Sequence, residues 1–166
     1  YDEVFAKDLE PEVREGFYAC NSYFMAIPTK ENQAFLAALR RNYGENATLT
    51  SFSAAIISCF RIWAKAVEKA GTTAPDAVVK AQEGEPGEKY GITTLGPQGR
   101  VTVVKQNHYT VQPAHLIQVQ KDGSHKIIKS WADQQPVIPK RYGGCVASVQ
   151  YGCRPLKEQC PDFPKK

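Results

Sequence analysis

Apolar residues recur at intervals of three and four positions in the first half of the chain, and this spacing predicts two long helices. We expect them at residues 29–43 and 51–70. Each follows a hydroxyl residue that can cap its first turn, Thr29 in one case and Thr50 or Ser51 in the other. Each is followed by a glycine, the residue that most readily ends a helix.

The second of these helices has the clearest apolar stripe. We expect the stripe to face the core, and its members are Ala55, Ile56, Cys59, Phe60, Trp63, Ala66 and Val67. The large residues Phe60 and Trp63, together with Ile127 and Ile128 farther along, are therefore predicted to be core residues.

Shorter elements surround the two helices. Residues 2–9 have the spacing of a short helix, and the aromatic-rich segment 17–24 is typical of a strand. A third helix is predicted at 75–82, where a proline begins the first turn. The Gly/Pro-rich stretch 84–88 then indicates a turn.

The second half of the chain changes to the alternation of a sheet. We predict strands at 99–105, 114–120 and 126–131. Between the last two lies Asp122-Gly123, a dipeptide that favours a hairpin turn. The sequence therefore predicts a mixed α/β architecture, with helices first and a small sheet after them.

Cysteines gather near the end of the chain. Residues 132–142 are expected to form an extended arm and 143–166 a loop-rich tail that contains Cys145, Cys153 and Cys160. A tail with so few apolar residues needs a covalent cross-link to hold its structure, so we predict at least one disulfide among these three cysteines. Their spacing does not match the tight knuckles of a zinc site, and we predict no metal. A reduced, cytoplasmic chain remains the alternative.

Composition narrows the class of protein. The chain has 166 residues, 42% of them hydrophobic and 23% charged, which is ordinary for a globular domain. The net charge of +4 is mild and its basic residues are scattered, which argues against nucleic-acid binding. No run of about 18 apolar residues occurs, so we expect no membrane span. The first residues lack a signal peptide and an initiating Met, so we expect a piece of a longer protein.

Several segments together resemble one known family. The Gly-led turn and strands of 96–131, the Tyr-Phe pair at 23–24, the Asn-x-x-Phe opening at 32–35 and the helix end at 63–70 occur in its order and spacing. They resemble the C-terminal part of the urea and short-chain-amide binding proteins, a branch of the type I periplasmic binding proteins. The resemblance covers residues 1–142. It implies the C-terminal portion of a two-lobed α/β fold, without the N-terminal lobe.

The resemblance also implies a ligand, a small neutral amide such as urea. Such a site pairs each polar atom of the amide and stacks a ring on its flat face, because an unpaired buried polar group costs about 1–3 kcal/mol. The ring and hydroxyl residues near the predicted strand and helix ends make Tyr23, Phe24, Ser51 and Phe52 the candidate contacts. Packing in the core is the alternative for Phe24.

Catalytic groups are not evident. His108, His115 and His125 are interpreted as turn and surface histidines, and no serine or cysteine stands in a nucleophile elbow. No glycine-rich phosphate loop occurs either. We therefore predict a protein that is not an enzyme and that needs no cofactor.

Two functions remain open. The first is an exported solute-binding chain that captures a small amide for uptake or sensing, together with a missing N-terminal portion or a partner chain. The second is an exported structural or assembly subunit that reuses the binding-protein fold. It is favoured by the cysteine-containing tail and by residues 50–57, which lack the acidic groups and the tyrosine of the family pattern. The sequon at Asn46 agrees with export.

Overall fold

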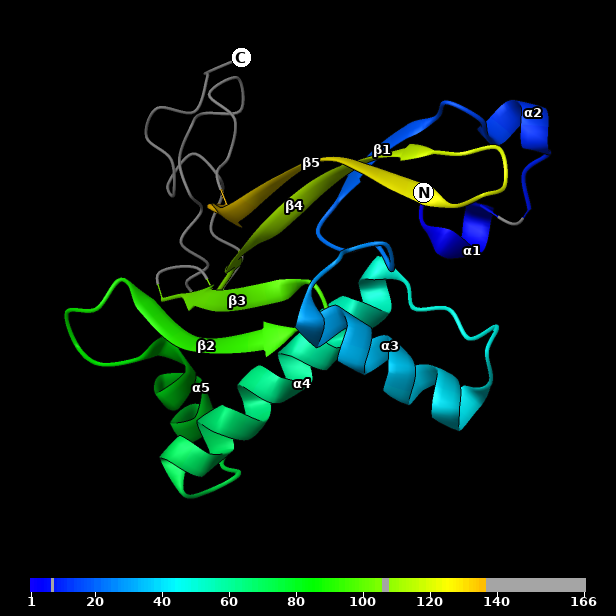
Figure 1. Ribbon diagram of the computed structural model, residues 1–166. Helices are drawn as coiled ribbons and strands as arrows, with labels where there is room; N and C mark the ends of the chain where they lie inside the picture. Colours follow the sequence, from blue (N-terminus) through cyan, green and yellow to red (C-terminus); the bar gives the residue numbers. More distant parts are fainter. Residues whose placement is uncertain (7, 106–107, 137–166) are drawn as a thin grey trace, which may run out of the picture.

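The computed structural model describes residues 1–6, 8–105 and 108–136, and it confirms a mixed α/β fold. Figure 1 shows two halves that are joined through the long strand β4 and through the segment that follows β1. One half contains α3 (Lys30–Tyr43), α4 (Ser51–Ala70), α5 (Pro75–Glu83), β2 (Tyr90–Gly96) and β3 (Gly99–Val104). The other contains α1 (Glu3–Ala6), α2 (Pro11–Arg14), β1 (Tyr18–Asn21) and β5 (His125–Gln134), and β4 spans Thr110–Val119.

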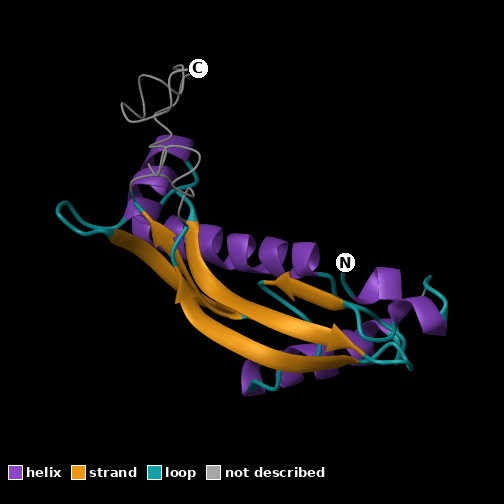
Figure 2. Cartoon of the chain, turned by 90° about the horizontal axis from the view of Figure 1, so that it is seen from above, coloured by secondary structure: helices purple, strands orange, loops and turns teal. Residues whose placement is uncertain are grey.

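Strand β4 organises the sheet. The strand order is β1-β4-β3-β2, β5 also pairs with β4, and all pairs are antiparallel. The start of β4 pairs with β3, where Val111 lies opposite Thr102, and its later part pairs with β1 and β5. Ile117 in that later part lies between Ala19 and Ile127. The long strands are strongly curved in Figure 2, as expected of a twisted sheet.

The predicted boundaries of the two long helices are confirmed, whereas the helix predicted at 2–9 is confined to Glu3–Ala6. The hydroxyl of Thr29 accepts a hydrogen bond from the backbone of Asn32, and Thr50 caps α4 through the backbone of Ser53. Gly71 ends α4 in the left-handed conformation at φ 66°, which costs glycine little. The predicted hairpin turn at residues 122–123 is also present between β4 and β5.

Strand β2 was not predicted, because its glycines resemble loop residues. They serve close packing instead. A Cβ at Gly91 would lie 1.9 Å from the carbonyl oxygen of Gln82, and a Cβ at Gly96 would lie 2.1 Å from the Ser58 hydroxyl. Helices α5 and α4 therefore approach this strand more closely than any side chain would allow.

The predicted face of α4 is wrong over most of the helix, although its last predicted members hold, since Ala66 is buried and Val67 packs against the same cluster. The buried residues of this helix are Ser51, Ala54, Ser58, Ile62 and Ala66, and most of them are small. Small side chains let the helix lie close to β2 and α5, while the longer Ile62 packs with Val101 and Val103 of β3. Phe60 and Trp63, predicted to be core residues, point outward with 64% and 45% of their surface exposed.

The two isoleucines of β5 that were predicted to be core residues differ in their burial. Ile127 is half-buried and packs against core clusters in both halves, while Ile128 is 43% exposed and does not belong to the core.

The predicted tail, with Cys145, Cys153 and Cys160, lies outside the described residues. The domain boundary after residue 142 and the disulfides therefore stay predictions. None of the helices that the structure describes is long and apolar enough to cross a bilayer.

Two substitutions test which face of α4 is buried. Ile62→Ala should lower the free energy of unfolding by about 2–5 kcal/mol, because it opens a cavity against β3. Trp63→Ala should cost less, although it removes more atoms, because that ring is half exposed. Urea unfolding of dilute protein measures both. A larger loss of stability for Trp63→Ala than for Ile62→Ala would show that the face predicted from the sequence is the buried one.

Candidate functional site

A polar cavity of about 360 Å³ opens where the β2–β3 hairpin meets the end of β5. Its walls come from four different strands and the residues after β5: Tyr90, Thr93, Arg100, Thr102, Val111, Asp133 and Gln135. Strand β4 crosses between the two halves near this place, as Figure 1 shows.

Two side-chain contacts join residues that line this cavity. The guanidinium of Arg100 forms an ion pair with Asp133 and donates to both carboxylate oxygens, with 3.2 Å between Nε and Oδ1. The Asp133 carboxylate raises the pKa of the Arg100 guanidinium. Tyr90 donates from its hydroxyl to the side-chain oxygen of Gln135 at 3.1 Å. The two charges therefore neutralise one another, and the cavity keeps mostly neutral polar groups.

The hydroxyls of Thr93 and Thr102 complete the polar lining. They lie 2.9 Å apart on paired strands, and either oxygen can donate to the other. Hydroxyl groups both donate and accept, so this wall can adapt to a ligand that offers a carbonyl or an N–H group. The described residues hold no group of three His, Cys, Asp or Glu side chains that could bind a metal ion.

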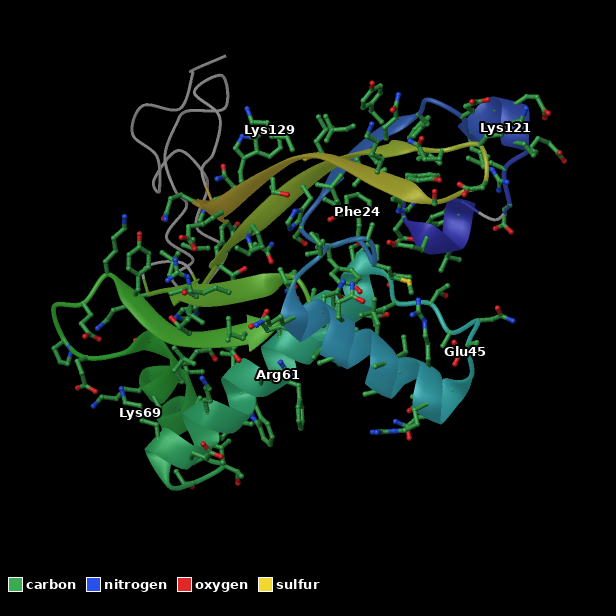
Figure 3. All side chains as sticks on the ribbon, viewed as in Figure 1. Phe24, Glu45, Arg61, Lys69, Lys121 and Lys129 are labelled. Carbon is green, nitrogen blue, oxygen red and sulfur yellow. The ribbon has the colours of Figure 1, made fainter. Side chains whose placement is uncertain are left out.

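The four residues predicted to contact ligand lie elsewhere. Tyr23 and Phe24 are fully buried, in clusters that belong to different halves, and Figure 3 shows Phe24 at the junction below β4. Burial raises the pKa of the Tyr23 hydroxyl, which therefore stays protonated and donates. Ser51 is buried and Phe52 is 78% exposed in the first turn of α4. None of the four lines the cavity.

Sequence reasoning missed the pairing of Arg100 with Asp133. Alternation along 99–105 shows only that Arg100 does not belong to the apolar set, and Asp133 falls in a segment predicted as an extended arm. The two residues are 33 positions apart, and only the antiparallel pairing of β3, β4 and β5 brings them together. No local motif could have revealed this contact.

The histidines are less exposed than predicted. His115 is 6% exposed and its Nδ1 lies 2.8 Å from the hydroxyl of Ser130. The side chain of His125 is 3% exposed, beside Glu3. The interpretation as turn and surface histidines is therefore wrong for these two. Burial lowers the pKa of His115, because a charged imidazole is poorly solvated inside the protein.

Comparison with known proteins identifies the family. Residues 2–147 match the family described as periplasmic binding protein domain, and the chain belongs to this family. A solute-binding protein of an ABC transporter from Rhodopseudomonas palustris, solved with 4-hydroxybenzoate, is 25% identical over 76% of this chain, with a TM-score of 0.59. An amino acid ABC transporter substrate-binding protein from Pseudomonas fluorescens Pf-5 is 18% identical over 81% of the chain, with a TM-score of 0.63. The fold is thus part of a type I periplasmic binding protein.

The matches cover only part of those proteins. The chain spans 35% of each of the two solved structures. A curated relative, limonene hydroxylase from Geobacillus stearothermophilus, is 25% identical over 125 residues, which are 75% of this chain and 21% of that protein. The chain therefore spans about a third of the solved structures and about a fifth of the curated relative.

The buried imidazole of His115 predicts a pH dependence of stability. Its pKa lies below 6.5 in the folded state, so protonation favours the unfolded state. The contribution of His115 to the free energy of unfolding should be complete above pH 6.5 and should fall as the pH drops below 6.5. His115→Gln, which does not titrate, should lose less stability between pH 7 and pH 5 than the wild type does. Equal losses measured by urea unfolding at the two pH values would contradict the prediction.

Proposed function

We propose that this chain is part of a solute-binding protein of the ABC-transporter class and that it captures a small neutral amide, such as urea or a short-chain amide, without chemical change. Support for the class comes from the family match and from the fold shared with solved solute-binding proteins. The same membership supports an exported, periplasmic or extracellular location.

The ion pair of Arg100 with Asp133, which neutralises both charges in the cavity, is the observation that most directly supports an amide as the ligand. A carboxylate ligand needs an available cation, but the Arg100 guanidinium is engaged by Asp133. An amide offers one carbonyl and N–H groups, which match the hydroxyls of Tyr90 and the paired threonines and the side-chain oxygen of Gln135. Each polar atom of a small amide can find a partner here without an unpaired charge.

The first turn of α4 remains a second candidate contact. The exposed ring of Phe52 could cover the flat face of an amide, and Ser51 stands beside it in the same turn. Tyr23 and Phe24 would then support the ligand indirectly, by fixing the segment that joins the halves. This arrangement would use all four residues that the sequence predicts.

Capture by closure needs a second wall. We propose that further polypeptide, on this chain or on a partner chain, supplies it, since the solved relatives are about three times longer than the part matched here. One wall leaves a bound amide half hydrated, with few contacts to offset the lost translational freedom. We therefore expect only millimolar affinity for the 166-residue chain alone.

A role as a structural or assembly subunit is the second candidate function. The observation that favours it is the row of large apolar side chains on the outer face of α4. We propose no hydroxylase activity, because the match to limonene hydroxylase covers 21% of that protein and the cavity contains no cofactor-binding motif.

Titration with acetamide, followed by backbone amide shifts in NMR, tests the solute and its site together. We expect saturable shifts at Thr93, Thr102 and Gln135, and weaker binding by Tyr90→Phe, which lacks one hydroxyl of the lining. Tyr43→Phe is the matched control, because Tyr43 is an exposed tyrosine at the end of α3.

Three results would count against this proposal. Amide shifts that do not saturate with acetamide would show that the cavity is not a binding site for it. Saturable shifts confined to the first turn of α4 would move it to Ser51 and Phe52. Tighter binding of 4-hydroxybenzoate than of acetamide at the same residues would replace the amide by an aromatic acid.

A further inference from the structure

The aspartate that lines the cavity stands at a bulge of β5. Between Gln112 and Ala114 of β4 the register shifts, so that Ala132 and Asp133 together lie opposite Pro113. The φ of Asp133 is 52°, in the left-handed region that few residues other than glycine adopt and that aspartate and asparagine tolerate better than most. A bulge of this kind can re-aim a side chain next to a binding site. Here it directs the Asp133 carboxylate toward β3.

The Asp133 carboxylate occupies one edge of the Arg100 guanidinium. Strand β4 lies between β3 and β5, so the two side chains meet across it. Nε of Arg100 donates to Oδ1 of Asp133 at 3.2 Å, and Nη2 donates to Oδ2. A guanidinium binds the carboxylate of a ligand with the same two-point geometry. Asp133 therefore stands where the carboxylate of a ligand would bind.

A carboxylate that belongs to the chain competes strongly with one in solution. Strand pairing holds Asp133 beside Arg100, so its effective concentration at the guanidinium is high. An anion that displaced it would also be repelled by the Asp133 charge, which remains in the cavity. Arg100 and Asp133 are the only charged side chains among the described residues that line the cavity. A neutral ligand meets neither obstacle.

We propose that Asp133 determines the charge selectivity of this cavity: by binding Arg100 it lets neutral amides bind and excludes carboxylates of the same shape. The inference rests on the proposed function, because it takes the cavity to be the solute site. Removing the charge of Asp133 should therefore convert an amide site into a site for short carboxylates.

Acetamide and acetate test the proposal, because they share a shape and differ in charge. NMR titrations of the full chain at equal ionic strength give both dissociation constants from the backbone amides of Thr93 and Thr102. We expect the wild type to bind acetamide at least 10-fold more tightly than acetate. Asp133→Asn should bind acetate at least 10-fold more tightly than the wild type does, because Arg100 is then available. Its affinity for acetamide should change by less than threefold.

The variants separate charge from structure. Asparagine keeps the size of the Asp133 side chain and tolerates the left-handed backbone there. Asp122→Asn is the matched control, because it removes the same charge in the hairpin turn between β4 and β5, outside the cavity, and asparagine also favours that turn. It should keep the preference of the wild type. Adding Arg100→Gln to Asp133→Asn should abolish the gain in acetate binding.

The Nε–H resonance of Arg100 reports the ion pair without reference to any affinity. In the wild type the hydrogen bond to Asp133 should protect this proton from exchange with water. In Asp133→Asn the protection should be lost, and it should return with acetate but not with chloride. A variant that had merely lost structure would not regain it.

The outcomes for this proposal and for the proposed function are distinct. Acetate that binds Asp133→Asn no more tightly than the wild type would overturn the role of Asp133, whatever acetamide does. Saturable binding of acetamide by the wild type would then leave the proposed function intact. Equal affinities of the wild type for the two ligands would also overturn the role of Asp133. A wild type that binds no acetamide, beside an Asp133→Asn variant that binds acetate, would contradict the amide function and support the role of Asp133.

Discussion

One buried amide side chain, that of Asn32, holds the segment that joins the two halves of this fold. Asn32 is completely buried at the start of α3 and accepts from the Tyr23 hydroxyl at 2.9 Å. Its amide nitrogen donates to the backbone oxygens of Met25 and Ile27 at 3.0 and 2.8 Å. Leaving any of these buried groups without a partner costs about 1–3 kcal/mol, so the contacts fix the course of residues 23–27.

The position of this segment decides where the rest of the chain lies. Neighbouring side chains diverge from it, since Tyr23 packs with Leu49 and Ala54 while Phe24 packs with Ile117 and Val119 of β4. Half-buried Ile127 touches both clusters. Because β4 also pairs with β3, the end of β5 reaches the β2–β3 hairpin, and the polar cavity forms there.

The sequence predicted those features that depend on local chemistry. The cap at Thr29, the helix end at Gly71 and the hairpin turn before Ser124 each follow from a few neighbouring residues, and all are present. The resemblance to type I periplasmic binding proteins also led to the correct family. The cavity could not be foreseen, because Arg100 and Asp133 meet only through the pairing of three strands.

The prediction of which face of α4 is buried failed for a different physical reason. Periodicity shows that a helix has an apolar stripe, but it does not show whether the large or the small residues face the core. Here Ser58 is buried because it permits close approach to Gly96 of β2, while Phe60 remains outside. Seen alone, this arrangement is unexpected.

A double-mutant cycle on Asn32→Ala and Tyr23→Phe tests most directly whether the buried amide organises the fold. Urea unfolding of the wild type, both single variants and the double variant gives the coupling free energy. If the hydrogen bond fixes the joining segment, each single variant loses about 1–3 kcal/mol of stability. The double variant then loses less than the sum, with a coupling of at least about 0.5 kcal/mol. Additive losses would mean that the two side chains act independently, and would contradict the role given to Asn32.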